Sequence, residues 1–204
     1  MQKKSLLVGL FVMGLLATSP AHAKGTHFIL EAEGGYGLTD NAVSTGFWGG
    51  TLGVGGKLGG FPVRFYLVTN VTGSLVDHNL QNTISYLSRS QWDASWLGGV
   101  RIYIPVFRHF RFFSQCLGGW SWFRSTWDVN SVEHFTTEDG AGTLRISAGF
   151  QYRFLRNFSI GIGVDRMIYW GKKDELALAA MLGFSEEIDE GDHTRIGLNF
   201  ALHF

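Results

Sequence analysis

The last ten residues of the chain constrain its fold most, because large apolar side chains there alternate strictly with small or polar ones. The apolar set is Ile196, Leu198, Phe200, Leu202 and Phe204. Successive side chains of a β-strand point to opposite faces, so the pattern predicts a strand with one apolar and one polar face. Ten residues is also about the length of a tilted strand that crosses a bilayer. A strand of this kind needs partners, and alternation recurs through most of the chain.

The alternating segments predict eight strands in all: 27–36, 47–58, 63–71, 92–104, 110–123, 144–154, 158–170 and 195–204. Long connections (38–45, 72–90, 124–140 and 171–192) alternate with short turns at 59–62, 105–109 and 156–157. This arrangement predicts an all-β fold, an eight-stranded antiparallel up-and-down transmembrane β-barrel. Arg166 interrupts the apolar face of 158–170, which predicts a bulge there or the end of the membrane span.

Residues 1–23 have the features of a secretory signal peptide. Lys3 and Lys4 precede a short apolar run, and Ala21-His22-Ala23 matches the small-x-small cleavage pattern. The remaining 24–204 are then one barrel domain. Seventeen basic and seventeen acidic residues balance, so nothing in the charge indicates nucleic-acid binding. Cys116 is the single cysteine, which excludes an intrachain disulfide, and its place in the alternation predicts that it faces lipid.

Aromatic residues are distributed as two girdles would require. All seven tryptophans lie at or just beyond the long-loop ends of the predicted strands: Trp48, Trp92, Trp96, Trp120, Trp122, Trp127 and Trp170. Phenylalanines gather at the short-turn ends: Phe28, Phe110, Phe112, Phe154, Phe158 and Phe204. Amphipathic rings collect at both interfaces of a bilayer. The alternative is a soluble eight-stranded binding barrel, which would place its apolar residues inside.

The chain has eight alternating segments, and the last of them ends on an aromatic residue. In these two features it resembles the small outer-membrane barrels of the outer-membrane protein A transmembrane domain and outer-membrane protein X class. The resemblance implies a bacterial outer-membrane location with both termini in the periplasm. It implies that the barrel-assembly machinery reads Ile196, Leu198, Phe200, Leu202 and Phe204 as an insertion signal. It also implies contact with outer-membrane lipid and lipopolysaccharide. Proteins with many different functions share this architecture, so the resemblance does not imply an activity.

Charged residues occupy the polar face of most predicted strands. An eight-stranded barrel has room inside for little more than its own side chains, so these charges must pair. The predicted interior network comprises Glu31, Glu33, Lys57, Arg64, Arg101, Arg145 and Asp165, with Asp93, Arg111, Arg153 and Arg195 also facing inward. It is interpreted as a plug, and a narrow ion channel gated by exchange of partners is the alternative.

No enzyme, cofactor or metal is expected. Lipid A deacylases on this scaffold carry a His-x-Ser pair, and no histidine here is followed by x-Ser. The nearest pattern is His134-Phe135-Thr136, close to Glu133 and Glu138; a lipid A-modifying hydrolase is therefore kept only as an alternative. The acidic residues of 186–192 have no spacing typical of a metal-binding loop. Segments 72–90 and 171–192 remain as candidate surfaces for docking or adhesion.

Overall fold

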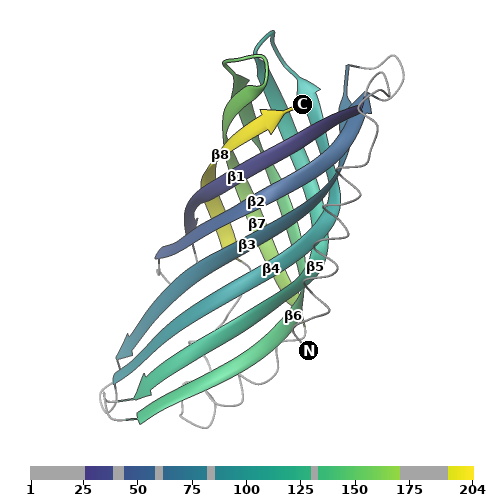
Figure 1. The fold of residues 1–204 in the computed structure, drawn as a ribbon. Helices are drawn as coiled ribbons and strands as arrows, with labels where there is room; N and C mark the ends of the chain where they lie inside the picture. The colour runs from purple at the N-terminus through teal and green to yellow at the C-terminus, as the bar shows by residue number, and fades with distance from the viewer. Residues whose placement is uncertain (1–25, 39–43, 58–61, 82–85, 130–132, 171–192) are drawn as a thin grey trace.

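The computed structural model describes residues 26–38, 44–57, 62–81, 86–129, 133–170 and 193–204. They form eight strands joined in chain order into one closed barrel (Figure 1). The strands are β1 (Thr26–Leu38), β2 (Ser44–Lys57), β3 (Arg64–Gln81), β4 (Tyr86–Pro105), β5 (Phe110–Val129), β6 (Glu133–Arg153), β7 (Phe158–Trp170) and β8 (His193–His203). The predicted signal peptide and the segment 171–192 lie outside the described residues.

The barrel closes because the first and last strands pair. All neighbours are antiparallel, and β8 runs beside β1 from the pair Ile29 and His203 to the pair Leu38 and Thr194. The predicted eight-stranded up-and-down barrel is thereby confirmed. The barrel end where 106–109 and 154–157 connect strands, and where β8 finishes, is called the short-turn end; it lies at the top of Figure 1.

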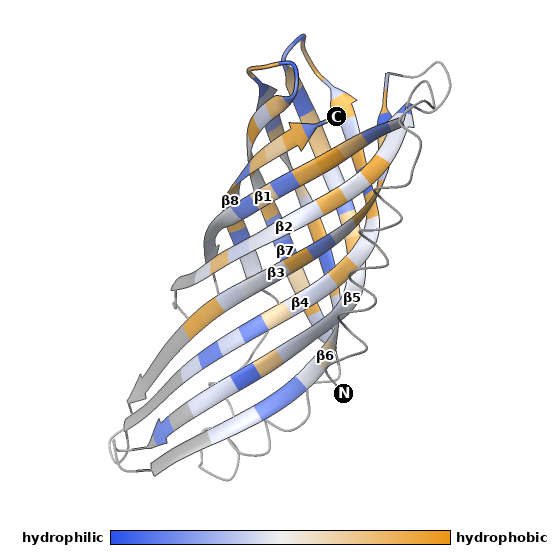
Figure 2. Cartoon of the chain, viewed as in Figure 1, coloured by the Kyte–Doolittle hydropathy of each residue, from blue (hydrophilic) through white to orange (hydrophobic). Residues whose placement is uncertain are grey.

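The polarity of the barrel is the reverse of that of a soluble protein. Large apolar residues in the middle of strands face outward, with Leu67 67%, Phe200 56% and Ile162 53% exposed. Fully buried positions instead include Arg101 and Asn70. Figure 2 shows the alternation as orange and blue bands along β1 and β8. An apolar exterior around a polar interior suits a barrel whose solvent is lipid, and it contradicts the soluble alternative.

Four strands are much longer than predicted. Segments 72–90 and 124–140, expected as loops, are mostly strand, since β3 continues to Gln81, β4 starts at Tyr86, β5 continues to Val129 and β6 starts at Glu133. The pairing of β3 with β4 runs to Gln81 and Tyr86, and that of β5 with β6 to Val129 and Glu133. These strand ends, called the extension, project past the other strands at the lower left of Figure 1. They lack a regular apolar face, so hydrophobic alternation could not reveal them.

A belt of outward tryptophans separates the barrel wall from the extension. Trp92, Trp120, Trp122 and Trp170 are each between 43% and 54% exposed. Beyond them the described outward side chains of β5 and β6 are polar, and exposed Arg124 on β5 contacts Glu138 on β6 at 3.9 Å. Tryptophan prefers the membrane interface and charged side chains prefer water, so the extension stands outside the bilayer. The side chain of Trp127 lies outside the described residues.

Strand β7 carries no bulge at Arg166, which was one of the two predicted alternatives. Its pairing with β6 is unbroken from Arg153 and Ser159 to Gly142 and Trp170, and its pairing with β8 is equally regular. Arg166 lies in this regular register with its side chain exposed on the outer face. Its position near Trp170 places it toward the end of the barrel opposite the short-turn end, called the long-strand end, where a long cationic side chain can reach the interface.

Two adjacent glycines of β5 offer a matched test of strand spacing. A Cβ on Gly119 would lie 2.1 Å from the main-chain oxygen of Trp96 on β4, whereas a Cβ on Gly118 would have no atom within 4 Å. We expect Gly119→Ala to lower the free energy of unfolding by about 1–3 kcal/mol, the usual range for overpacking. Gly118→Ala should leave it unchanged or raise it slightly. Urea unfolding in detergent micelles measures both, and equal effects would contradict this close approach of β4 and β5.

Candidate functional site

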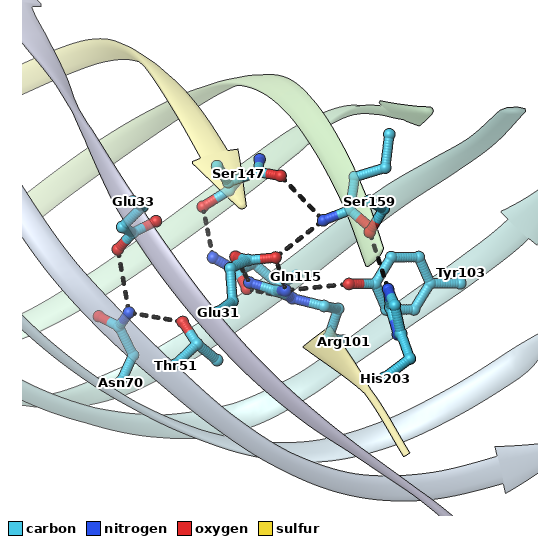
Figure 3. Close-up of polar contacts among 12 residues, drawn as sticks. Glu31, Glu33, Thr51, Asn70, Arg101, Tyr103, Gln115, Ser147, Ser159 and His203 are labelled. Carbon is cyan, nitrogen blue, oxygen red and sulfur yellow. Dashed lines mark hydrogen bonds and ion pairs between the residues drawn. The ribbon is translucent and has the colours of Figure 1, made fainter. Parts of the chain in front are cut away.

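The barrel interior is organised around Arg101, which is fully buried. Its two terminal nitrogens each donate to one carboxylate oxygen of Glu31 at 2.8 Å, a bidentate pair across the barrel. Its Nε donates to Gln115 at 2.8 Å, and Nη1 also donates to the Tyr103 hydroxyl at 3.1 Å (Figure 3). Gln151 donates to the same Glu31 carboxylate at 2.8 Å. Both charges therefore have several hydrogen-bond partners, as burial requires.

A second layer surrounds Arg145, which bridges two carboxylates. It donates to Glu33 at 2.6 and 2.7 Å and to Asp165 at 2.7 Å. Asp165 also accepts a 2.7 Å hydrogen bond from Arg195 Nε, and Asn70 donates to Glu33 at 3.0 Å. The two layers together are called the ion network. Each of its carboxylates faces at least one guanidinium, so it carries little net charge.

The cavity that the described residues of the ion network enclose is small. The cavity beside Glu31, Glu33, Arg145 and Asp165 has a volume of about 20 Å³, enough for about one water molecule. Toward the long-strand end, hydroxyl contacts continue the packing, with Ser121 Oγ lying 2.6 Å from both Ser95 Oγ and Thr143 Oγ1. The arrangement can hold the strands in register and block passage along the barrel axis.

The structure brings together five of the residues predicted for the interior network and separates two. Glu31, Glu33, Arg101, Arg145 and Asp165 form the ion network. Lys57 and Arg64 lie instead near the mouth of the short-turn end, where they line a different cavity. Their positions at the end of β2 and the start of β3 account for the difference, because only mid-strand side chains reach the middle of the barrel.

The outward set at the end of the chain points as the alternation predicted. Leu198, Phe200 and Phe204 are 51%, 56% and 63% exposed on the outer face. Main-chain hydrogen bonds join Phe204 and Phe28 in both directions, at 3.0 and 3.2 Å. Cys116 is also exposed on the outer face, as expected.

Sequence patterns did not reveal the contact between Ser159 and His203. Ser159 Oγ lies 2.8 Å from His203 Nε2, joining β7 to β8. A serine beside a histidine can be a nucleophile and its base. Here, however, Ser159 is only 2% exposed, and His203 Nδ1 has no hydrogen-bond partner among the described residues to orient the ring. A cross-strand pair separated by 44 positions has no local signature in the sequence.

The other candidates for chemistry lie at the extension or outside the described residues. The segment His134-Phe135-Thr136 is in β6, not in a loop, and its first two side chains are not described. The acidic segment 186–192 lies outside the described residues. Within the described ranges, no group of three or more His, Cys, Asp or Glu residues could hold a metal ion. Those ranges also contain no helix long and apolar enough to cross a membrane.

Comparison with known proteins gives matches at the level of structure alone. No protein-family model matches the chain, and no curated protein matches it. A major outer membrane protein from Thermus thermophilus superposes with a TM-score of 0.52 at 12% identity, covering 88% of this chain and 99% of that one. This chain has the fold of the outer-membrane β-barrels. The sequence resemblance to the small eight-stranded class is confirmed at that level, together with the transmembrane barrel architecture.

Two further solved structures are similar at lower scores. Ail, the attachment invasion locus protein of Yersinia pestis, has a TM-score of 0.49 at 10% identity, covering 88% of this chain and 99% of its own. The outer membrane enzyme PagL has a TM-score of 0.48 at 10% identity, covering 84% of this chain and 97% of its own. Proteins with this architecture perform different functions, so the fold does not assign one to this chain.

Proposed function

We propose that this protein is a non-enzymatic barrel of the bacterial outer membrane that keeps both termini in the periplasm and docks a partner through its extension. In this orientation the short-turn end faces the periplasm, and β3–β6 project from the cell, as short periplasmic turns and long external elements generally do. Outer-membrane lipid and lipopolysaccharide surround the wall, and the barrel-assembly machinery inserts it. The extension beyond the tryptophan belt is the observation that carries the proposal.

The extension has two properties of a docking surface. The described side chains on the outer face of its β5–β6 part are polar and lie beyond the tryptophan belt, so this face is accessible from solvent. Its edges are also incompletely paired within the described residues: β6 pairs with β7 only from Gly142 onward, and β3 pairs with β2 only up to Val76. A strand edge with unpaired main-chain groups can accept a strand from a partner.

The packed interior supports a docking role over transport. An ion crossing the barrel would have to pass Arg101, which is 0% exposed and fixed by Glu31. It would lose its hydration in a cavity of about 20 Å³. The ion network is therefore proposed to be a structural plug, and the narrow channel stays the less favoured alternative.

The proposal is tested by shortening β3 and β4 within the extension while the pairing of the two strands below the cut is kept. We expect removal of residues 78–89, with a two-residue Asn-Gly turn joining the paired residues Asp77 and Ser90, to weaken partner docking while the barrel still assembles. The reason is that the barrel pairing of β3 with β2 ends at Val76, below the cut. Cell adhesion and surface cross-linking would be measured, with heat-modifiable gel migration as the check on folding.

A variant of the opposite end provides the control. Val106→Ser with Phe107→Ser changes exposed short-turn residues, which are 46% and 73% exposed, and should leave adhesion intact. Adhesion and cross-linking that persist undiminished in the shortened barrel would remove the β3–β4 part of the extension from the proposed function.

A further inference from the structure

The mouth of the short-turn end is lined by basic residues. Lys57, Arg64, Arg108, Arg111 and Arg153 surround a cavity of about 230 Å³, called the basic vestibule. A neighbouring cavity of about 160 Å³ shares Arg64 and Arg153 and is also lined by three further basic side chains, His27, Arg156 and His203. Lys57 and Arg64 are direct cross-strand partners, an arrangement of like charges that destabilises a sheet.

No acidic side chain among the described residues lines either cavity. The sequence explains this, because 54–66, 101–115, 149–161 and 196–204 contain neither Asp nor Glu. Along β1 the first acidic residue is Glu31, and Arg101 already pairs with it. The basic vestibule therefore differs from the ion network, in which every carboxylate accepts a hydrogen bond from an arginine.

Several hydrogen-bonding atoms of this region are buried without a partner among the described residues. They are Arg111 Nη1, Arg153 Nε and His203 Nδ1. His203 is only 5% exposed, and its other ring nitrogen already contacts Ser159. The two arginine nitrogens are donors, and buried donors without acceptors are costly, so their position beside these cavities indicates that an acceptor belongs there.

We propose that the basic vestibule binds a phosphate group. Guanidinium groups match phosphate oxygens in charge and in bidentate geometry, and Arg111 and Arg153 come from neighbouring strands that face the same cavity. The phosphate is either free or carried by an anionic lipid headgroup, because exposed Phe107 and Leu155 place the mouth beside apolar surface. That the vestibule faces the periplasm rests on the proposed orientation, whereas phosphate binding does not.

Binding can be measured on the whole barrel folded in an uncharged detergent. Inorganic phosphate is titrated by calorimetry in one arm, and micelles containing a short-chain phosphatidylglycerol are used in the other. We expect saturable binding in at least one arm, weakened at least tenfold by the double substitution Arg111→Gln and Arg153→Gln. Inorganic phosphate alone would identify a free phosphate ligand, and phosphatidylglycerol alone a lipid headgroup; either result supports the proposal.

A matched double variant controls for the loss of positive charge. Arg124→Gln with Arg166→Gln removes two exposed basic residues outside the vestibule and should leave phosphate affinity within about twofold. Melting temperature gives a second measurement. The ligand should raise the melting temperature of the native barrel and should not change the melting temperature of the Arg111→Gln, Arg153→Gln variant. The proposal is overturned if neither ligand binds, if acetate binds as well as phosphate, or if both double variants bind alike.

Discussion

Replacing Arg101 with methionine is expected to lower the free energy of unfolding by about 3–5 kcal/mol, the cost typical of removing one partner of a buried ion pair. The substitution leaves the Glu31 carboxylate, 2% exposed, with Gln151 as its remaining hydrogen-bond donor in the ion network. It also removes the donor from which Gln115 and Tyr103 each accept a hydrogen bond. Reversible urea unfolding in micelles, followed by tryptophan fluorescence, measures the change.

Two controls separate the buried pair from charge in general. Arg124→Met breaks an ion pair whose side chains are 63% and 75% exposed, so its effect should not exceed about 1 kcal/mol. Adding Glu31→Gln to Arg101→Met removes the stranded charge and should recover a substantial part of the loss. A cost for Arg101→Met no larger than that for Arg124→Met would show that the pair does not stabilise the barrel.

The period of two in the sequence predicted side-chain direction well. Arg101 and Arg145 face inward and Cys116 faces outward, as the alternation required, because each residue along a strand reverses the face. The alternation does not state the depth of a residue inside the barrel. Depth follows from register, and register is set by pairing along the whole strand.

Two features depended on information that local sequence does not contain. Glu31 and Arg101 are 70 positions apart and meet across the barrel, so only closure of the sheet selects them as partners. Strand β3 continues beyond Val71 although Thr72, Gly73 and Ser74 interrupt the apolar alternation. Main-chain pairing with β4 holds this part of the strand in place, and such pairing depends weakly on side-chain identity.

The two groups of basic residues in the barrel show why position along a strand matters as much as face. Lys57 and Arg64 share the inward alternation of Arg101, yet they end in the basic vestibule because they stand at strand termini. A mid-strand arginine must be paired to be buried, whereas one at the mouth can remain available for a ligand. The same residue type therefore serves a structural role in the ion network and a proposed binding role in the vestibule.

Replacing Phe204 with aspartate is expected to reduce the inserted barrel in cells to a small fraction of the native amount, with export and signal-peptide cleavage unchanged. The expectation follows from the proposed role of Ile196, Leu198, Phe200, Leu202 and Phe204 as the insertion signal. The folded barrel itself should tolerate the change, because the Phe204 side chain is 63% exposed and its hydrogen bonds to Phe28 use the main chain. Unfolding of the refolded variant in micelles should shift by no more than about 1 kcal/mol.

Insertion in cells and stability in micelles are both measured, because a residue of a recognition signal affects only insertion, whereas a structural residue affects both. Phe158→Asp is the matched control, since Phe158 is a 46% exposed aromatic residue of the same girdle that begins β7. If exposure to the interface were all that mattered, both substitutions would reduce insertion equally. Selective failure of the Phe204 variant in cells, with normal refolding in detergent, is expected if β8 is read before the barrel closes; equal insertion of the two variants would refute that role for Phe204.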